Sequence, residues 1–390
     1  MLSTLGGVGM WSIVVVLPAV QADFGVDRAD ASLPYTLTMV GFVFGGTLMG
    51  WLADRFGIVL PVIVGALSLS LGYVLASRAD SLLEFALIHG VLIGFLGSSA
   101  TFGPVIAGIS LWFDRRRGIA VAIGASGAYM AGTVWPLAIQ GVTDALGWRD
   151  AYFAIGIFCL VTMLPLVLAL RRPPPLQPAV EASPGGFTGE TRPLGMRPNL
   201  LQGMLILAGI SCCVAMAMPQ VHIVALCADL GYGAQRGAEM LSLMLGFGII
   251  SRLASGWIAD RIGPLPTLLL GSVLQAVSLL LYMTSQSVGS LYVVSALFGL
   301  FQGGIVLSYA LIVRQFFPAA QAGTRIGLVL SATLGGMAIG GWMSGAIYDL
   351  TLSYDAAFLN GFFWNLLNIA IALFLLVRGG RRRRTGPAMA

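Results

Sequence analysis

The sequence predicts an all-α membrane protein with twelve transmembrane helices in two six-helix halves. Hydrophobic residues make up 57% of the 390-residue chain and charged residues 9%, whereas ordinary soluble domains are about a quarter charged. So few charges cannot cover a water-exposed surface, so the surrounding solvent must be largely lipid. The segment GWLADRFG at 50–57 returns as GWIADRIG at 256–263, an offset of 256 − 50 = 206 residues. This long-period repeat indicates two similar halves.

Each predicted helix is a mostly apolar stretch of about 20 residues or more, the length that spans a bilayer. In chain order the stretches cover residues 2–21, 32–53, 58–77, 83–112, 117–140, 150–170, 199–228, 236–259, 264–284, 288–316, 321–347 and 355–377. The first has no basic residues before it, and PAVQA at 18–22 is a poor cleavage site, so we interpret it as a helix and not a signal peptide. Internal prolines such as Pro104 and Pro136 predict kinks.

A proline-rich segment separates the sixth and seventh predicted helices. Residues 171–198 hold seven of the 18 prolines, which is typical of a flexible linker. Its place near the middle of the chain agrees with the repeat. We therefore predict an N-terminal half at 1–170, a cytoplasmic linker at 171–198, a C-terminal half at 199–377 and a basic cytoplasmic tail at 378–390.

The arginines predict the orientation of the chain. With a cytoplasmic N-terminus, sixteen of the 21 arginines fall in cytoplasmic segments, and four fall in external loops, namely Arg28, Arg78, Arg149 and Arg236. Such an excess marks cytoplasmic loops. We therefore expect a multi-pass membrane protein with both termini in the cytoplasm. All 21 basic residues are arginine, which together with the abundance of alanine and glycine suggests a GC-rich bacterial genome and hence a bacterial inner membrane. This topology explains the net charge of +5 without nucleic-acid binding, and the tail RGGRRRR at 378–384 is expected to contact anionic lipid.

The remaining polar residues argue against a metal site, a cofactor site or an enzyme. The four cysteines, Cys159, Cys212, Cys213 and Cys227, lie in apolar stretches without metal-ligand spacing, so we expect them to pack as small apolar residues. The two histidines, His89 and His222, lie in separate predicted helices, and no nucleophile–base spacing appears. The sequence also lacks a loop that resembles an ion-selectivity filter, which argues against a channel.

The repeated loop, the twelve helices and the central linker together resemble the major facilitator superfamily over essentially the whole chain. The stretches LWFDRRRGIAVAIGASG at 111–127, GWRDAY at 147–152, VHIVALCADLG at 221–231 and SYDAAF at 353–358 are similar to the bacterial monocarboxylate transporter and oxalate–formate antiporter group. The resemblance implies transport of a small organic acid by a protein with two rocking halves.

The two copies of the loop are the expected gating residues. They comprise Gly50, Asp54, Arg55 and Gly57 in the first copy and Gly256, Asp260, Arg261 and Gly263 in the second. Asp54 is placed to receive charge-assisted hydrogen bonds from a neighbouring helix end and so to lock one conformation. The alternative is a tight polar loop shaped by its glycines. The basic residues that commonly follow the first copy in the family are replaced by Ile58, Val59 and Leu60.

Arg252 is the expected substrate-binding residue. No other charge lies between Glu239 and Asp260, so Arg252 sits about 12 Å inside the cytoplasmic end of the eighth helix at ~1.5 Å per residue. An arginine inside a membrane is costly and usually faces a cavity, and its planar fork matches a carboxylate. The resemblance also assigns this arginine to carboxylate binding. A permanent ion pair within the protein is the alternative.

Missing charges narrow the expected substrate to a monoanion. The predicted eleventh helix holds no cation at 327–347, where relatives that bind dicarboxylates have one. Mammalian-type relatives have an aspartate four residues before the arginine, where this chain has Gly248, and they also have a lysine in the first helix that this chain lacks. His222 is the candidate for proton coupling because imidazole titrates near pH 6.5; a neutral histidine bonded between helices, or a proton carried with the anion itself, are the alternatives.

The rest of the pocket should be small and mostly apolar. By depth on the helices that line the cavity in this superfamily, the candidates are Trp11, Phe102, Phe301 and Gln302, with Tyr129 on the fifth helix. We therefore expect a monomeric secondary transporter that moves a lactate- or pyruvate-like acid, with a proton, by alternating access. Two alternatives stay open: an exporter of drugs or other metabolites from the same superfamily, and a sensor that binds an organic acid without moving it.

Overall fold

The computed structural model confirms the all-helical fold. It describes residues 1–112, 117–170, 193–285 and 287–385. The helices of the first half are α1 (Leu2–Gly6), α2 (Val8–Phe24), α3 (Arg28–Ala31), α4 (Leu33–Phe56), α5 (Val59–Ala76), α6 (Leu82–Ile88), η1 (His89–Gly97), η2 (Ser98–Thr101), α7 (Gly103–Trp112), α8 (Arg117–Leu146) and α9 (Trp148–Ala169). Those that follow are η3 (Pro193–Gly195), α10 (Pro198–Asp229), α11 (Ala234–Ile262), α12 (Pro264–Thr284), α13 (Val288–Gln302), α14 (Ile305–Phe316), α15 (Ala319–Thr351) and α16 (Tyr354–Thr385).

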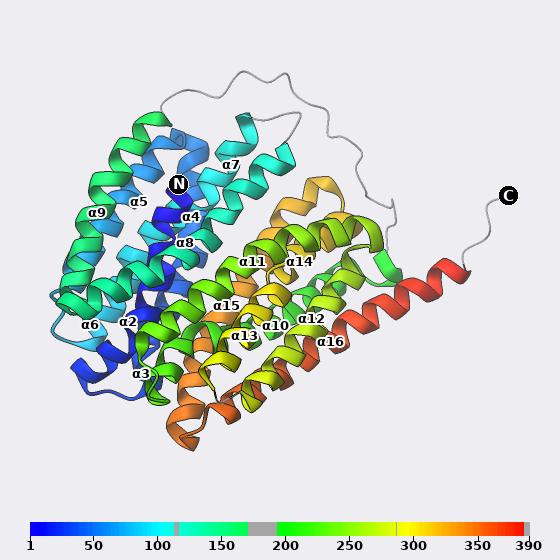
Figure 1. The fold of residues 1–390 in the computed structure, drawn as a ribbon. Coiled ribbons are helices and arrows are strands. Elements are labelled where there is room, and N and C mark those ends of the chain that lie inside the picture. The colour runs from blue at the N-terminus through cyan, green and yellow to red at the C-terminus, as the bar shows by residue number, and fades with distance from the viewer. Residues whose placement is uncertain (113–116, 171–192, 286, 386–390) are drawn as a thin grey trace.

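The number of membrane-length helices agrees with the sequence. Eleven stretches of the described chain are long and apolar enough to cross a membrane. The 30-residue helix α8 runs through the bundle beside them (Figure 1), which accounts for the twelve predicted helices. The predicted linker falls on residues 171–192, outside the described part, and on η3. Helix α16 continues to Thr385, beyond the predicted end at 377.

Two predicted helices are interrupted, and glycines explain where. The predicted helix 83–112 is α-helical only at its ends, because its middle forms the π-helix η1 and the 3₁₀-helix η2. There a Cβ on Gly41 or Gly45 of α4 would lie 2.2 or 2.0 Å from a carbonyl oxygen of η1, so the two backbones touch. The predicted helix 288–316 breaks at Gly303 between α13 and α14. In contrast, α8 continues through Pro136.

The two halves meet along one face of α15. Ala338, Gly341 and Gly345 share this face because residues three and four apart are neighbours on a helix. The Ala338 carbonyl accepts a hydrogen bond of 3.1 Å from the Thr36 hydroxyl on α4. A Cβ on Gly341 would lie 3.0 Å from the Tyr35 ring, and one on Gly345 would lie 2.9 Å from the backbone of α3. Membrane helices use such small residues for close packing.

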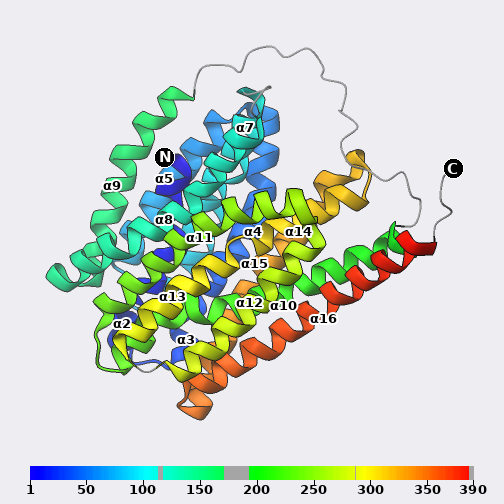
Figure 2. The same ribbon diagram turned by 45° about the vertical axis from the view of Figure 1, so that its right-hand side comes forward.

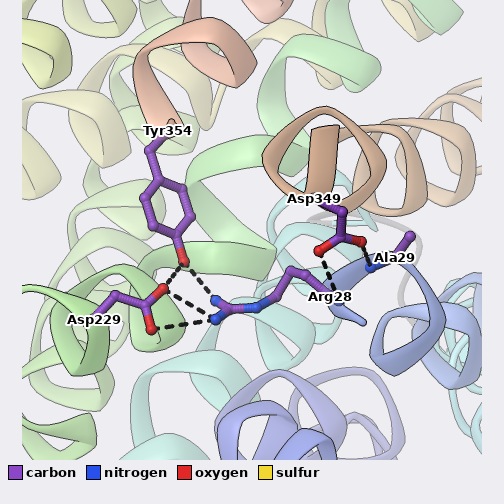
Figure 3. Close-up of polar contacts among 5 residues, drawn as sticks. All are labelled: Arg28, Ala29, Asp229, Asp349 and Tyr354. Carbon is purple, nitrogen blue, oxygen red and sulfur yellow. Dashed lines mark hydrogen bonds and ion pairs between the residues drawn. The ribbon is translucent and has the colours of Figure 1, made fainter. Parts of the chain in front are cut away.

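A cluster of polar contacts, which we call the latch, joins the halves at the end of this face (Figure 3). The latch consists of Arg28 on α3, Asp229 on α10, Asp349 on α15 and Tyr354 on α16. The Arg28 guanidinium donates to both carboxylate oxygens of Asp229 at 3.0 and 3.2 Å and also to the Tyr354 hydroxyl, which donates to Asp229 at 2.6 Å. Asp349 accepts the backbone N–H groups of Arg28 and Ala29 at 2.9 and 2.7 Å.

The halves separate toward the opposite end, which we call the linker end because α9 ends and α10 begins there. The ribbons lie close together near α3 and diverge toward the linker end in both views (Figures 1 and 2). A Cβ on Gly46 or Gly50 of α4, or on Gly323 or Gly327 of α15, would meet no atom within 4 Å. The latch therefore joins the halves at one end, and their helices diverge toward the linker end.

We predict that breaking the latch opens the latch end. The Arg28 side chain is 5% exposed and that of Asp229 33%, and a hydrogen bond to a charged group is worth about 1.5–3 kcal/mol. Since 1.4 kcal/mol corresponds to a factor of ten, Arg28→Ala should raise maleimide labelling of a Thr36→Cys reporter about tenfold. The four native cysteines are buried, so they give little background.

The matched control is Arg149→Ala, which removes an ion pair with Asp23 that lies entirely within the first half. It should leave labelling of the reporter unchanged. The charge exchange of Arg28→Asp with Asp229→Arg should restore part of the protection. Equal labelling in Arg28→Ala and wild type would contradict the latch as a contact that holds the halves together.

Candidate functional site

Arg252 reaches from the second half of the bundle to the first. It lies on α11 ten residues before the last residue, Ile262, about 15 Å along the helix at ~1.5 Å per residue. Its guanidinium carbon stands 4.5 Å from the centre of the Tyr129 ring on α8, and its Nη1 donates to the Ala125 carbonyl at 3.5 Å. The Nε atom is buried without a hydrogen-bond partner.

The charge of Arg252 is not neutralised by the described part of the protein. The three ion pairs of the described residues are Arg28 with Asp229, Arg149 with Asp23 and Arg236 with Glu239. An aromatic ring attracts a cation through its negative face, but it does not neutralise the charge. The geometry thus leaves a half-buried cation with an unpaired buried donor, which has the charge and the free N–H to bind an anion.

Tyr129 contacts Arg252 directly, and two further candidates, Trp11 and Gln302, lie beside the helices that make this contact. A Cβ on Gly248, one turn before Arg252, would lie 2.5 Å from the Tyr129 ring. One turn farther along α8, a Cβ on Gly132 would lie 3.0 Å from Nε1 of Trp11, which is buried without a partner. A Cβ on Gly303 would lie 2.3 Å from the Gly248 carbonyl, which places the neighbouring Gln302 at this level. The structure therefore brings Tyr129, Trp11 and Gln302 around the helix that carries Arg252.

Gln302 has a second unpaired buried donor in this region. Its Oε1 accepts a hydrogen bond of 2.9 Å from Gln220 on α10, whereas its Nε2 is buried and has no partner. Both amides are at most 2% exposed. A buried donor without a partner is destabilising, so a ligand oxygen or a water at this point would lower the free energy of the site.

The described contacts do not join the two remaining aromatic candidates to Arg252. Phe102 packs against Phe42 with ring centres 6.2 Å apart. The carbonyl of Phe301 would lie 3.4 Å from a Cβ on Gly271 of α12. Both side chains are half-buried. Their contribution to a substrate pocket stays a prediction.

The two histidines have different surroundings. His222 is buried on α10, and its Nε2 lies 2.8 Å from the Gly341 carbonyl of α15, whereas its Nδ1 has no partner. Since a carbonyl only accepts, Nε2 carries a proton. His89 is bonded at both nitrogens within the first half, to the hydroxyls of Thr38 at 3.2 Å and Tyr152 at 3.1 Å.

The two repeated loops have the same shape at the linker end. Helices α4 and α11 end at Gly57 and Gly263, whose φ values of 79° and 93° favour glycine. The Asp-Arg pairs at 54–55 and 260–261 are exposed. Each arginine packs over a tryptophan one turn earlier, Arg55 at 5.5 Å from the Trp51 ring centre and Arg261 at 3.7 Å from that of Trp257. The two loops at the linker end therefore share their backbone turn and their arginine–tryptophan contact.

Sequence reasoning missed the latch. Two of its residues lie inside stretches that carried the family resemblance, Asp229 in 221–231 and Tyr354 in 353–358. Arg28 was assigned only to an external loop. The sequence did place opposite charges, Arg28 and Asp229, near the same predicted surface of the membrane. Which charges pair, however, depends on how the helices pack.

Comparison with known proteins identifies the family. The model of the Major Facilitator Superfamily matches residues 1–268 and 229–389. The chain is 29% identical over 322 residues to monocarboxylate transporter 13 of Rattus norvegicus, covering 81% of this chain and 72% of that protein. It is 25% identical over 319 residues to the Agnestins efflux protein AgnL12 of Paecilomyces divaricatus, covering 80% and 70%.

A solved structure supports the same fold. The crystal structure of a bacterial homologue of the human lysosomal transporter Spinster superposes with a TM-score of 0.77 at 14% identity, over 100% of this chain and 97% of that chain. The family match extends over both halves of the bundle. The chain therefore belongs to the major facilitator superfamily, resembles its monocarboxylate transporters, and is a multi-pass membrane transporter and not an enzyme.

Proposed function

We propose that the protein is a secondary active transporter of a small monocarboxylate, such as lactate or pyruvate, and that Arg252 binds the carboxylate. The observation that carries this proposal is the open Nε of a half-buried arginine that contacts both halves of the bundle. The guanidinium fork forms two parallel hydrogen bonds with a carboxylate. Its Nη1 already donates to the Ala125 carbonyl, so the edge formed by Nε and Nη2 is the one proposed to bind the carboxylate.

The charges near the site favour one carboxylate over two. On α15 the described charged side chains lie toward its ends, at Arg325 and Asp349. A dicarboxylate would thus find no second cation from α15 at the depth of Arg252. The likeness to proteins described as monocarboxylate transporters supports the same substrate class.

The difference between the two ends of the bundle supports alternating access. The latch joins the halves at one end, and their helices diverge toward the other. If the arginine distribution sets the orientation, the linker end is cytoplasmic and the structure is inward-facing. Closing the linker end would bring the loops of Asp54 and Asp260 toward the opposite half, while the latch would have to break. We propose that this monomer works in a bacterial inner membrane with cytoplasmic termini.

A proton is proposed to accompany the acid, and His222 is the proposed acceptor. Its Nδ1 is buried with a free lone pair, and its Nε2 hydrogen bond fixes the ring between α10 and α15. The ring can therefore take up a proton without losing its present hydrogen bond. His89 is a poorer candidate because both its nitrogens are already paired.

Export of a larger metabolite is the second candidate function. The relative AgnL12 is described as an efflux protein, and half-buried aromatics such as Phe102 and Phe301 could contact a larger apolar molecule. This alternative predicts that transport of lipophilic compounds survives in Arg252→Ala. A sensor, in contrast, would bind the acid without moving it.

We predict that counterflow of labelled lactate into proteoliposomes depends on Arg252. A charge-assisted hydrogen bond is worth about 1.5–3 kcal/mol, so Arg252→Ala should raise the KM for lactate about tenfold to a hundredfold. Arg252→Lys should recover only part of the loss because lysine lacks the planar fork. The thermal stability of each variant controls for misfolding. Wild-type counterflow in Arg252→Ala would contradict the proposal, and binding without flux in the wild type would favour the sensor.

We further predict that His222→Gln separates proton coupling from substrate exchange. The glutamine amide can still donate to the Gly341 carbonyl, but it does not titrate. Lactate counterflow at equal pH should stay within about twofold of wild type, since tenfold corresponds to 1.4 kcal/mol and the donor is kept. Accumulation driven by an imposed pH gradient should be lost. If accumulation persists, His222 is a structural residue, and the proton travels with the acid.

A further inference from the structure

Tyr129 and Arg252 form a pair across the two halves of the transporter. Tyr129 belongs to α8 of the first half, and Arg252 belongs to α11 of the second. The ring lies 4.5 Å from the guanidinium carbon, and Ala125, one turn before Tyr129, supplies the carbonyl that accepts from Nη1 at 3.5 Å. The proposed substrate-binding arginine is thus held in place by groups of the opposite half.

Gly248 makes room for this ring. A Cβ at Gly248 would lie 2.5 Å from Cε1 and 2.7 Å from Cδ1 of Tyr129, and contacts under 3.0 Å are essentially never made by real Cβ atoms. On its other side, the Gly248 carbonyl is approached by Gly303 of the same half. The ring therefore fills the place, one turn before Arg252, that any side chain at position 248 would need.

Because the Tyr129 ring occupies the space of a side chain at position 248, it changes the chemistry around Arg252. Residues four apart on a helix are neighbours, so a side chain at Gly248 would point to Arg252 and could neutralise or hydrogen-bond it. The Tyr129 ring lies against the guanidinium, 4.5 Å from its carbon atom, and carries no charge. It leaves the Nε edge free and the positive charge in place.

We propose that Tyr129 is a positioning and specificity-determining residue, which holds the Arg252 guanidinium from the opposite half so that its free edge selects one carboxylate. This inference rests on the proposed function and names the residue that shapes its anion site. The ring acts through Arg252 by stacking, and Gly248 acts by leaving the ring its space.

The test is a double-mutant cycle read by the KM and maximal rate of lactate counterflow. Tyr129→Leu should raise the KM about tenfold with a smaller change in the maximal rate, and Gly248→Ala should do the same because its Cβ displaces the ring. Tyr129→Phe keeps the ring and should retain a KM within about twofold of wild type. The double variant Tyr129→Leu/Gly248→Ala should have a KM no higher than that of Tyr129→Leu alone, because the effects of residues that act through one contact are not additive.

The matched control is Gly246→Ala, at the contact between the same two helices, α11 and α8. A Cβ there would meet the nearest atoms of Thr133 at 3.5 and 3.7 Å, an ordinary contact, so the KM should be unchanged. Arg252→Ala distinguishes the two proposals. If it abolishes counterflow while Tyr129→Leu and Gly248→Ala keep the wild-type KM, the inference is overturned and the proposed function stands. If Arg252→Ala keeps counterflow, both are overturned.

Discussion

The contact between the two halves is the constraint on which the rest of the structure depends. Lipid tails are as apolar as leucine, so no hydrophobic force drives membrane helices together, and they associate by close packing and polar contacts. This chain meets that requirement with glycines, since Gly341 and Gly345 let α15 touch the first half, and Gly248 admits the ring of Tyr129. Polar groups at the same interface, the latch and Arg252, then decide how the halves are arranged.

Hydrogen bonds between buried polar groups also link the helices within each half. Within the first half, His89, Tyr152, Ser12 and Tyr73 are linked by hydrogen bonds, and within the second half Asn368 bonds with Ser272 and Tyr309. Such networks fix the helices that they join relative to one another. Buried polar atoms without partners occur in both halves, and those at or near the candidate site are Nε1 of Trp11, Nδ1 of His222, Nε of Arg252 and Nε2 of Gln302. An unpaired buried polar atom is costly, so a polar ligand that bonded to one of them would lower the free energy of the site.

The sequence was sufficient to predict the features that depend only on the order of residues along the chain. The helices follow from apolar length, and Arg252 stands out because no other charge shares its stretch of helix. The interruption of the fourth helix at η1 was not predicted, because it arises where glycines of α4 meet the η1 backbone. The latch was missed for a related reason: Arg28 and Asp229 are 201 residues apart, and no local pattern pairs them.

The sequence by itself determined that the chain is a two-part membrane bundle with one exceptional arginine in its second part, because apolar length, charge position and a repeat need no knowledge of contacts. Gly46 stands in the first repeat where Arg252 stands in the second, 252 − 206 = 46. Only the tertiary structure decided what surrounds that arginine. Tyr129 comes from the other half and takes the space that Gly248 leaves. Packing brings such distant residues together, and the geometry of that contact sets which edge of the guanidinium stays free.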